Sequence, residues 1–164
     1  MPVATRGFTP YAKHKVQHEH SELDKVCRYL DRNYPNVVYF TDYAAGLNLT
    51  DKERQKMMRQ RSHDGMQDLT ILEPRQGYHG MVVEFKKTGV TVYRRDGLLK
   101  KQSYNRRYHT SKGLVIKSGD HLLEQARVLT ILRVKGYYAC WGLGYLRTIE
   151  MIDTYMGVLK LFSE

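Results

Sequence analysis

The chain of 164 residues contains few cysteines, few prolines and no long apolar run. Its two cysteines, Cys27 and Cys140, stand far apart, so they form neither a zinc knuckle nor a disulfide framework. No apolar stretch approaches the roughly 20 residues that cross a bilayer, and the N-terminus lacks the apolar middle of a secretion signal. We therefore expect a cytoplasmic protein that is not secreted and has no membrane-spanning segment.

Acidic residues are also scarce beside basic ones. Lys and Arg number 27 against 17 Asp and Glu, which gives a formal net charge of +10. This charge points to a polyanionic partner, either nucleic acid or an anionic membrane surface. The 41% hydrophobic content, with 13 Tyr, four Phe and one Trp, is typical of a globular chain rather than a disordered one. The length fits one domain.

Periodicity and turn residues predict alternating helices and strands. Helices are expected at 18–32, at 49–62 with a capping box from Thr50 to Glu53, at 120–135, and through Ile149, Ile152 and Met156. Strands are expected at 36–43, 68–73, 80–87 and 136–142, the second and third of these forming a hairpin. This order favours a mixed α/β sheet with a right-handed crossover. It places a flexible basic arm at 1–17 before one domain at 18–164.

A basic insert at 88–117 interrupts this domain. It holds eight Lys and Arg but a single acid, Asp96. Asp96 and Gly97 predict a two-residue hairpin turn, because glycine tolerates positive φ. The insert could contact a DNA backbone, and its tyrosines, Tyr104 among them, could stack on unpaired bases; a solvated hairpin is the alternative. The candidate nucleic-acid-binding residues are Arg94, Arg95, Lys100, Lys101, Arg106 and Arg107.

Three charged residues of the hairpin at 68–87 form the candidate site. A two-residue period places Glu84 and Lys86 on the same face of their strand, opposite its apolar residues. The hairpin can bring Asp68 close to Glu84. Two carboxylates held together repel each other unless a divalent cation neutralises them. A solvated face is the alternative, because this charge pattern is common on exposed strands.

Polar residues on two expected helices could complete the site. Glu19 projects close to the centre of the apolar stripe of the helix at 18–32, and Glu22 lies nearer its edge as the second choice. The helix dipole alone could account for a glutamate in the first turn. Gln125 lies beside the leucines of the helix at 120–135, where a buried amide requires hydrogen-bond partners unless it sits at the rim.

The ordered set of these motifs resembles the VRR-NUC (virus-type replication-repair nuclease) proteins of the PD-(D/E)xK superfamily. The residues that carry the resemblance are "GMQDL" (65–69) and "GYHGMVVEFK" (77–86). Around them, "EHSELDKVCRYLDRNYP" (19–35), "HLLEQARVLTILRVKGYYACW" (121–141) and "TIEMIDTYM" (148–156) resemble the family's first helix, its glutamine helix with the last strand, and its final helix. The resemblance covers 19–156 except the insert, and "YAAGLNLT" (43–50) follows the family pattern only loosely.

This resemblance implies an α/β fold with a PD-(D/E)xK restriction-endonuclease-like core, in which helices flank a mixed central sheet. It implies a Mg²⁺- or Mn²⁺-dependent deoxyribonuclease, a hydrolase of phosphodiester bonds. Asp68, Glu84 and the backbone carbonyl of Phe85 would hold the metal, and Glu19 would complete the site or support a second ion. Lys86 would position the nucleophile or stabilise the transition state, and Gln125 would orient Lys86 or the water.

The resemblance further implies a homodimeric, structure-selective endonuclease that acts on branched DNA in replication or repair. The family name suggests a phage origin, in which case the protein would act in the cytoplasm of a bacterial host. A basic nucleic-acid-binding module without catalysis is the alternative function, with the acids in structural roles.

Overall fold

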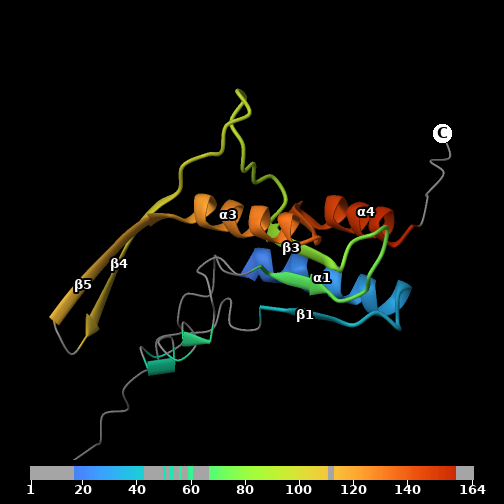
Figure 1. The fold of residues 1–164 in the computed structure, drawn as a ribbon, viewed down its shortest axis with the longest axis horizontal. Coiled ribbons are helices and arrows are strands. Elements are labelled where there is room, and N and C mark those ends of the chain that lie inside the picture. Colours follow the sequence, from blue (N-terminus) through green and yellow to red (C-terminus); the bar gives the residue numbers. More distant parts are fainter. Residues whose placement is uncertain are drawn as a thin grey trace, which may run out of the picture.

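The computed structural model describes residues 17–42, 67–110 and 113–157, and from the segment between them 50, 52, 53, 56, 59 and 60. The side chains of 17–20, 106 and 108–110 are not described. Within these ranges, a four-stranded sheet lies between helices, and a separate two-stranded ribbon extends from it (Figure 1). The predicted arm at 1–17 falls outside the described residues except for its last residue.

The described helices and strands follow the predicted order except for two additional strands in the insert, and most of the helix predicted at 49–62 lies outside the described residues. The helices are α1 (Gln17–Asn33), α3 (His121–Val134) and α4 (Tyr145–Met156). The strands are β1 (Tyr39–Thr41), β2 (Leu69–Ile71), β3 (Met81–Lys86), β4 (Ser103–Thr110), β5 (Gly113–Asp120) and β6 (Tyr138–Leu143). Among the helices described, none is long and apolar enough to span a bilayer.

The central sheet is mixed, as predicted, with strand order β1-β2-β3-β6. β2 runs antiparallel to both β1 and β3, and Leu69 stands opposite Val83. β6 runs parallel to β3, with Trp141 opposite Glu84. Parallel neighbours require a long crossover, and here the crossover consists of the insert followed by α3. The insert is therefore anchored at both ends by elements that flank the centre of the sheet.

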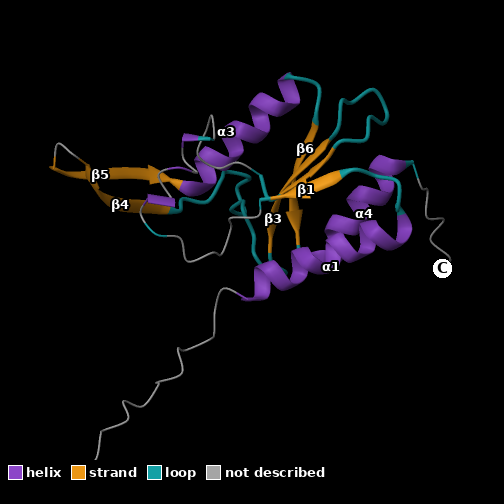
Figure 2. Cartoon of the chain, turned by 90° about the horizontal axis from the view of Figure 1, so that it is seen from below, coloured by secondary structure: helices purple, strands orange, loops and turns teal. Residues whose placement is uncertain are grey.

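Helices cover both faces of this sheet, α1 and α4 on one side and α3 on the other (Figure 2). Alternate residues of β3 point to opposite faces, so Val83 packs in the core with α1 and α4 while Val82 packs in the core with α3. The first five residues of β3 are buried. A charged residue in this strand therefore lies inside the protein unless it stands at the strand's end.

Side-chain caps fix the starts of two helices. The Asp120 carboxylate accepts a hydrogen bond from Leu123 N at 3.1 Å and begins α3. The capping box predicted for the helix at 49–62 is confirmed. Glu53 N donates to Thr50 Oγ1 at 3.4 Å, and Thr50 N donates to Glu53 Oε2 at 2.8 Å. Both starts could be predicted because the cap residue lies next to the helix it begins.

The insert differs from the prediction in two respects. First, it contains the antiparallel pair β4 and β5, which were not expected as strands and which extend the insert to Asp120. Second, the hairpin turn has a three-residue loop, since Arg94 N donates to Leu98 O at 2.8 Å across residues 95–97. Gly97 has φ +80°, and its N–H donates to Arg94 O at 3.1 Å. The predicted two-residue turn is therefore wrong, although glycine takes the expected left-handed conformation.

Candidate active site

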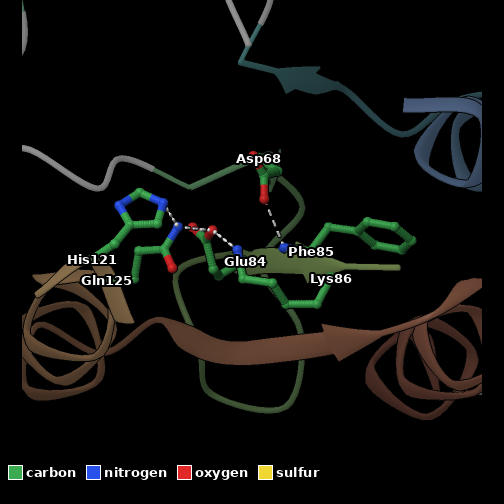
Figure 3. A network of polar contacts seen from close by, with 6 residues as sticks. All are labelled: Asp68, Glu84, Phe85, Lys86, His121 and Gln125. Atoms are coloured by element: carbon green, nitrogen blue, oxygen red, sulfur yellow. Dashed lines mark hydrogen bonds and ion pairs between the residues drawn. The ribbon is translucent and has the colours of Figure 1, made fainter. Parts of the chain in front are cut away.

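The candidate site lies where β2 and β3 separate. Leu69 and Val83 form the last residue pair of the β2–β3 ladder. Beyond this pair, the Asp68 side chain replaces the backbone as acceptor, and its Oδ2 accepts a hydrogen bond from Phe85 N at 2.8 Å (Figure 3). The N–H and C=O of one strand residue point to the same edge, so the Phe85 carbonyl also faces the Asp68 side. A carboxylate and a carbonyl thus approach each other at the end of the hairpin.

Glu84 lies on the α3 side of the same strand and is 1% exposed. Its Oε1 accepts hydrogen bonds from Lys86 Nζ at 2.8 Å and from Gln125 Nε2 (Figure 3). Its Oε2 is buried and has no hydrogen-bond partner among the described residues. The prediction that Glu84 and Lys86 share a face is confirmed, and the burial excludes an ordinary solvated face.

The two carboxyl groups have perturbed acidities. Burial, and then the negative charge of Asp68, raise the pKa of Glu84 well above its ordinary value, and Lys86 opposes this only in part. Burial also raises the pKa of Asp68, against the opposing effects of Lys86 and the Phe85 N–H. Two buried carboxyl groups in proximity resist simultaneous ionisation, and a bound cation relieves that resistance.

Gln125 joins the site from α3, where it is buried beside Leu129. Its Nε2 lies 3.2 Å from His121 Nε2, so one amide nitrogen contacts both Glu84 and His121. Sequence reasoning predicted Gln125 but missed His121. The available signal was their spacing, because residues four apart share one face of a helix.

A third acid lies near Asp68, and sequence reasoning missed it. Asp42 follows β1; its N–H donates to Asp68 O at 3.1 Å, and its negative charge contributes to the raised pKa of Asp68. The available signal was the antiparallel pairing of β1 with β2, which places the residue after Thr41 beside the residue before Leu69.

The helix acids are placed differently from each other. Glu19 lies in α1, but its side chain is outside the described part of the chain. Glu22 Oε2 accepts hydrogen bonds from Thr88 N and Oγ1, both at 2.9 Å. Burial alone would raise the pKa of Glu22, but these two hydrogen bonds and one from the Tyr145 N–H outweigh it, so the pKa is lowered. Glu22 thus holds α1 to the end of β3 and the start of α4, away from Glu84.

The donors present suit a hard divalent cation. Mg²⁺ and Mn²⁺ prefer carboxylate and carbonyl oxygens, which Asp68, Glu84 and Phe85 provide. The buried Oε2 of Glu84 is the atom that such an ion would satisfy. Among the described residues no three His, Cys, Asp or Glu side chains are grouped closely enough to hold a metal. The described side chains therefore supply two carboxylates, and water, backbone or substrate would supply the other ligands.

The predicted nucleic-acid-binding residues fall on two segments. Arg94, Arg95, Lys100 and Lys101 are exposed around the hairpin at 93–99, and Arg94 Nη2 lies 3.1 Å from Asp96 Oδ2. Arg107 is exposed on β4, and the Arg106 side chain is outside the described set. Tyr104 OH donates to Glu124 Oε1 at 2.6 Å, so this tyrosine holds β4 to α3 rather than standing free to stack on a base.

Comparison with known proteins identifies a fold. No protein family model matches the chain, and no curated protein matches it. A solved structure described as a VRR_NUC domain protein resembles it with a TM-score of 0.54 and 20% sequence identity, over 88% of this chain and 93% of that one. This similarity confirms the predicted α/β core with its mixed sheet, and it supports the resemblance to VRR-NUC proteins.

Proposed function

We propose that this protein is a metal-dependent nuclease that hydrolyses phosphodiester bonds of DNA. One observation carries the proposal: the buried carboxyl group of Glu84 and the Asp68 carboxylate meet beside the Lys86 ammonium and the Phe85 backbone at one end of β3. A purely structural ion pair would not require the second acid, which raises the pKa of the first. The similarity in fold to a VRR_NUC domain protein supports this assignment.

Asp68, Glu84 and the Phe85 carbonyl would hold Mg²⁺ or Mn²⁺, and Glu19 from α1 would complete the site. When bound, the cation lowers the pKa of water and screens negative charge on the phosphate. Because burial makes Glu84 costly to ionise, the site should take up a cation together with loss of a proton. Affinity for the metal should therefore fall in acid.

Lys86 and Gln125 set the geometry around Glu84. The Lys86 ammonium holds Glu84 Oε1 at 2.8 Å and is partly exposed, so it can turn toward a phosphate oxygen or the attacking water. Gln125 donates to the same oxygen, so α3 fixes the orientation of the Glu84 carboxylate. Each of these side chains therefore acts in the chemistry by orientation or by charge.

The net charge of +10 supports DNA as the substrate, since a basic chain attracts a polyanion. The resemblance to VRR-NUC proteins adds two finer proposals, that the protein is a homodimer and that it selects branched DNA in replication or repair. Arg94, Arg95, Lys100 and Lys101 would contact the phosphates that flank the cleaved bond.

The test is cleavage of linear, flapped and four-way DNA by the purified chain, with Mn²⁺ and with EDTA. Glu84→Gln preserves the size of the side chain but removes its charge, so it should slow cleavage more than about 100-fold while DNA binding persists. Glu150→Gln is the matched control, because Glu150 is exposed on α4 and forms a surface ion pair with Arg147.

Cleavage that persists in EDTA, or in Glu84→Gln, would overturn the proposal. Binding of DNA without Mn²⁺-dependent cleavage by the wild type would instead favour the non-catalytic nucleic-acid-binding module. Among the three substrates, equal rates on linear and branched DNA would contradict the structure selectivity.

A further inference from the structure

We infer that the β4–β5 ribbon is an arm that enters a groove of duplex DNA beside the candidate active site. The inference rests on the proposed function only in taking DNA as the substrate. The ribbon extends away from the sheet and its helices in both views (Figures 1 and 2). Its root is held to α3 by hydrogen bonds.

The ribbon exposes apolar side chains on both of its faces. Leu114, Val115 and Ile116 are consecutive in β5 and are 54%, 42% and 56% exposed. Successive strand residues point to opposite faces, so neither face of the ribbon is solely polar. A two-stranded hairpin is marginally stable alone, and exposed apolar side chains of this kind mark a contact surface. The arm therefore requires a partner that can contact both faces at once.

Basic residues lie on the same ribbon as these apolar ones. Segment 103–120 holds four Lys and Arg and one acid, and that acid, Asp120, lies at the root. Arg107 stands opposite Ile116, and Lys117 follows Ile116. A groove of duplex DNA offers phosphates along both rims and bases and sugars between them. Such a groove suits a ribbon that carries both basic and apolar side chains. A second copy of the chain carries the same net charge of +10 and repels the arm.

The dimensions of the ribbon also fit a groove. The major groove of B-DNA, about 12 Å wide, admits a two-stranded β-ribbon. Each strand has eight residues, and at about 3.4 Å per residue it reaches roughly 27 Å. At 3.4 Å per base pair that length corresponds to about eight base pairs.

The root of the ribbon is fixed to the helix that bears Gln125. β5 ends at Asp120 and α3 begins at His121, with no linker between them. His121 N donates to Gln102 O at 2.9 Å, and Tyr104 OH donates to Glu124 Oε1 at 2.6 Å, so β4 is held to α3 as well. One turn further, Gln125 bonds Glu84. A duplex gripped by the arm therefore lies at a set position relative to the carboxylates, and cleavage should require about eight base pairs on one side of the cut.

The test uses the full chain with Leu114 and Ile116 both replaced by Ser. Binding to a 20-base-pair duplex and to a 20-nucleotide single strand is measured by fluorescence anisotropy in EDTA. We expect about tenfold weaker duplex binding and unchanged single-strand binding. Val134→Ser, at an exposed apolar site at the end of α3, is the matched control and should bind like the wild type. Arg107→Ala with Lys117→Ala should lower the salt slope by about two.

A second measurement uses no variant. With Mn²⁺, wild-type cleavage is followed on substrates whose duplex arm shortens from 16 to four base pairs, and the rate should drop between about ten and six. Unchanged duplex binding by the Ser variant, or a rate independent of arm length, overturns the inference. Loss of dimers in the Ser variant, measured by light scattering, with no loss of duplex binding would identify a second copy as the occupant. Loss of duplex binding in a chain that never cleaves would support the arm and overturn the nuclease proposal alone.

Discussion

The β2–β3 hairpin and the β4–β5 ribbon are both antiparallel pairs, yet they lie in opposite environments. The first five residues of β3 are buried, whereas no described residue of β5 is. Helices from distant parts of the chain cover the two faces of the hairpin, whereas no described residue of the ribbon belongs to either buried core cluster. Local sequence thus produces a strand in either case, and tertiary packing alone decides whether that strand becomes core or contact surface.

The comparison extends to charge. In the hairpin, Glu84 is buried where the backbone ladder ends and pairs with Lys86, and Asp68 accepts a hydrogen bond from the Phe85 N–H beside it. Along the ribbon, Arg107 is exposed and Lys117 is partly exposed. The first arrangement suits a small cation and a single phosphate; the second suits a long polyanion. The following changes would break or sharpen this contrast.

The largest expected effect comes from the same substitution made in each region. Ile71→Ala in β2 removes a residue with no solvent exposure and should reduce the free energy of unfolding by about 2 to 5 kcal/mol. Ile116→Ala in β5 removes a side chain that is 56% exposed and should change it by less than about 0.5 kcal/mol. Urea unfolding followed by circular dichroism measures both. Equal losses would show that the ribbon is packed against the body in solution.

The next effect is metal-linked stability. Mn²⁺ at 100 times its dissociation constant should stabilise the wild type by about 2.7 kcal/mol, because it binds only the folded chain. Asp68→Asn should abolish the gain, since it removes a ligand. The Leu114→Ser and Ile116→Ser double variant should keep the full gain, because the ribbon holds no ligand. Thermal unfolding with and without Mn²⁺ decides this, and a gain retained in Asp68→Asn would place the ion elsewhere.

The smallest effect concerns pH in EDTA. The pKa of Glu84 is raised in the folded chain, so the stability linked to its proton is present below its ordinary value of 4.5 and is lost as the pH rises through the raised pKa. Glu84→Gln removes this titration, so the free energy of unfolding of the variant should increase relative to that of the wild type as the pH rises above about 4.5. Urea unfolding at several pH values measures the difference. Glu150→Gln should follow the wild type, and a constant difference for Glu84→Gln would contradict the assignment.

The sequence was most informative where a residue's environment depends on its immediate neighbours. The two-residue period of β3 placed Glu84 and Lys86 together, and the helical stripe placed Gln125 toward the sheet, because both patterns are local. The ribbon strands were missed because their residues show no two-residue alternation of apolar and polar side chains, and no described residue of β5 is buried. His121 was missed because its partner, Gln125, was interpreted only through its leucine neighbours.

Asp120 links the ribbon to α3 at a single point near the ribbon's root. Its carboxylate caps α3 through Leu123 N and accepts a hydrogen bond from Gln102 N at 3.3 Å, so a single side chain connects the helix start to the residue that precedes β4. An arm of about 27 Å turning by ten degrees about this fulcrum sweeps its tip through about 5 Å. The same turn moves His121, one residue away, by only a small fraction of that distance. If a duplex bound along the ribbon moved, the displacement at Gln125, whose amide holds Glu84, would therefore be much smaller than the displacement at the tip.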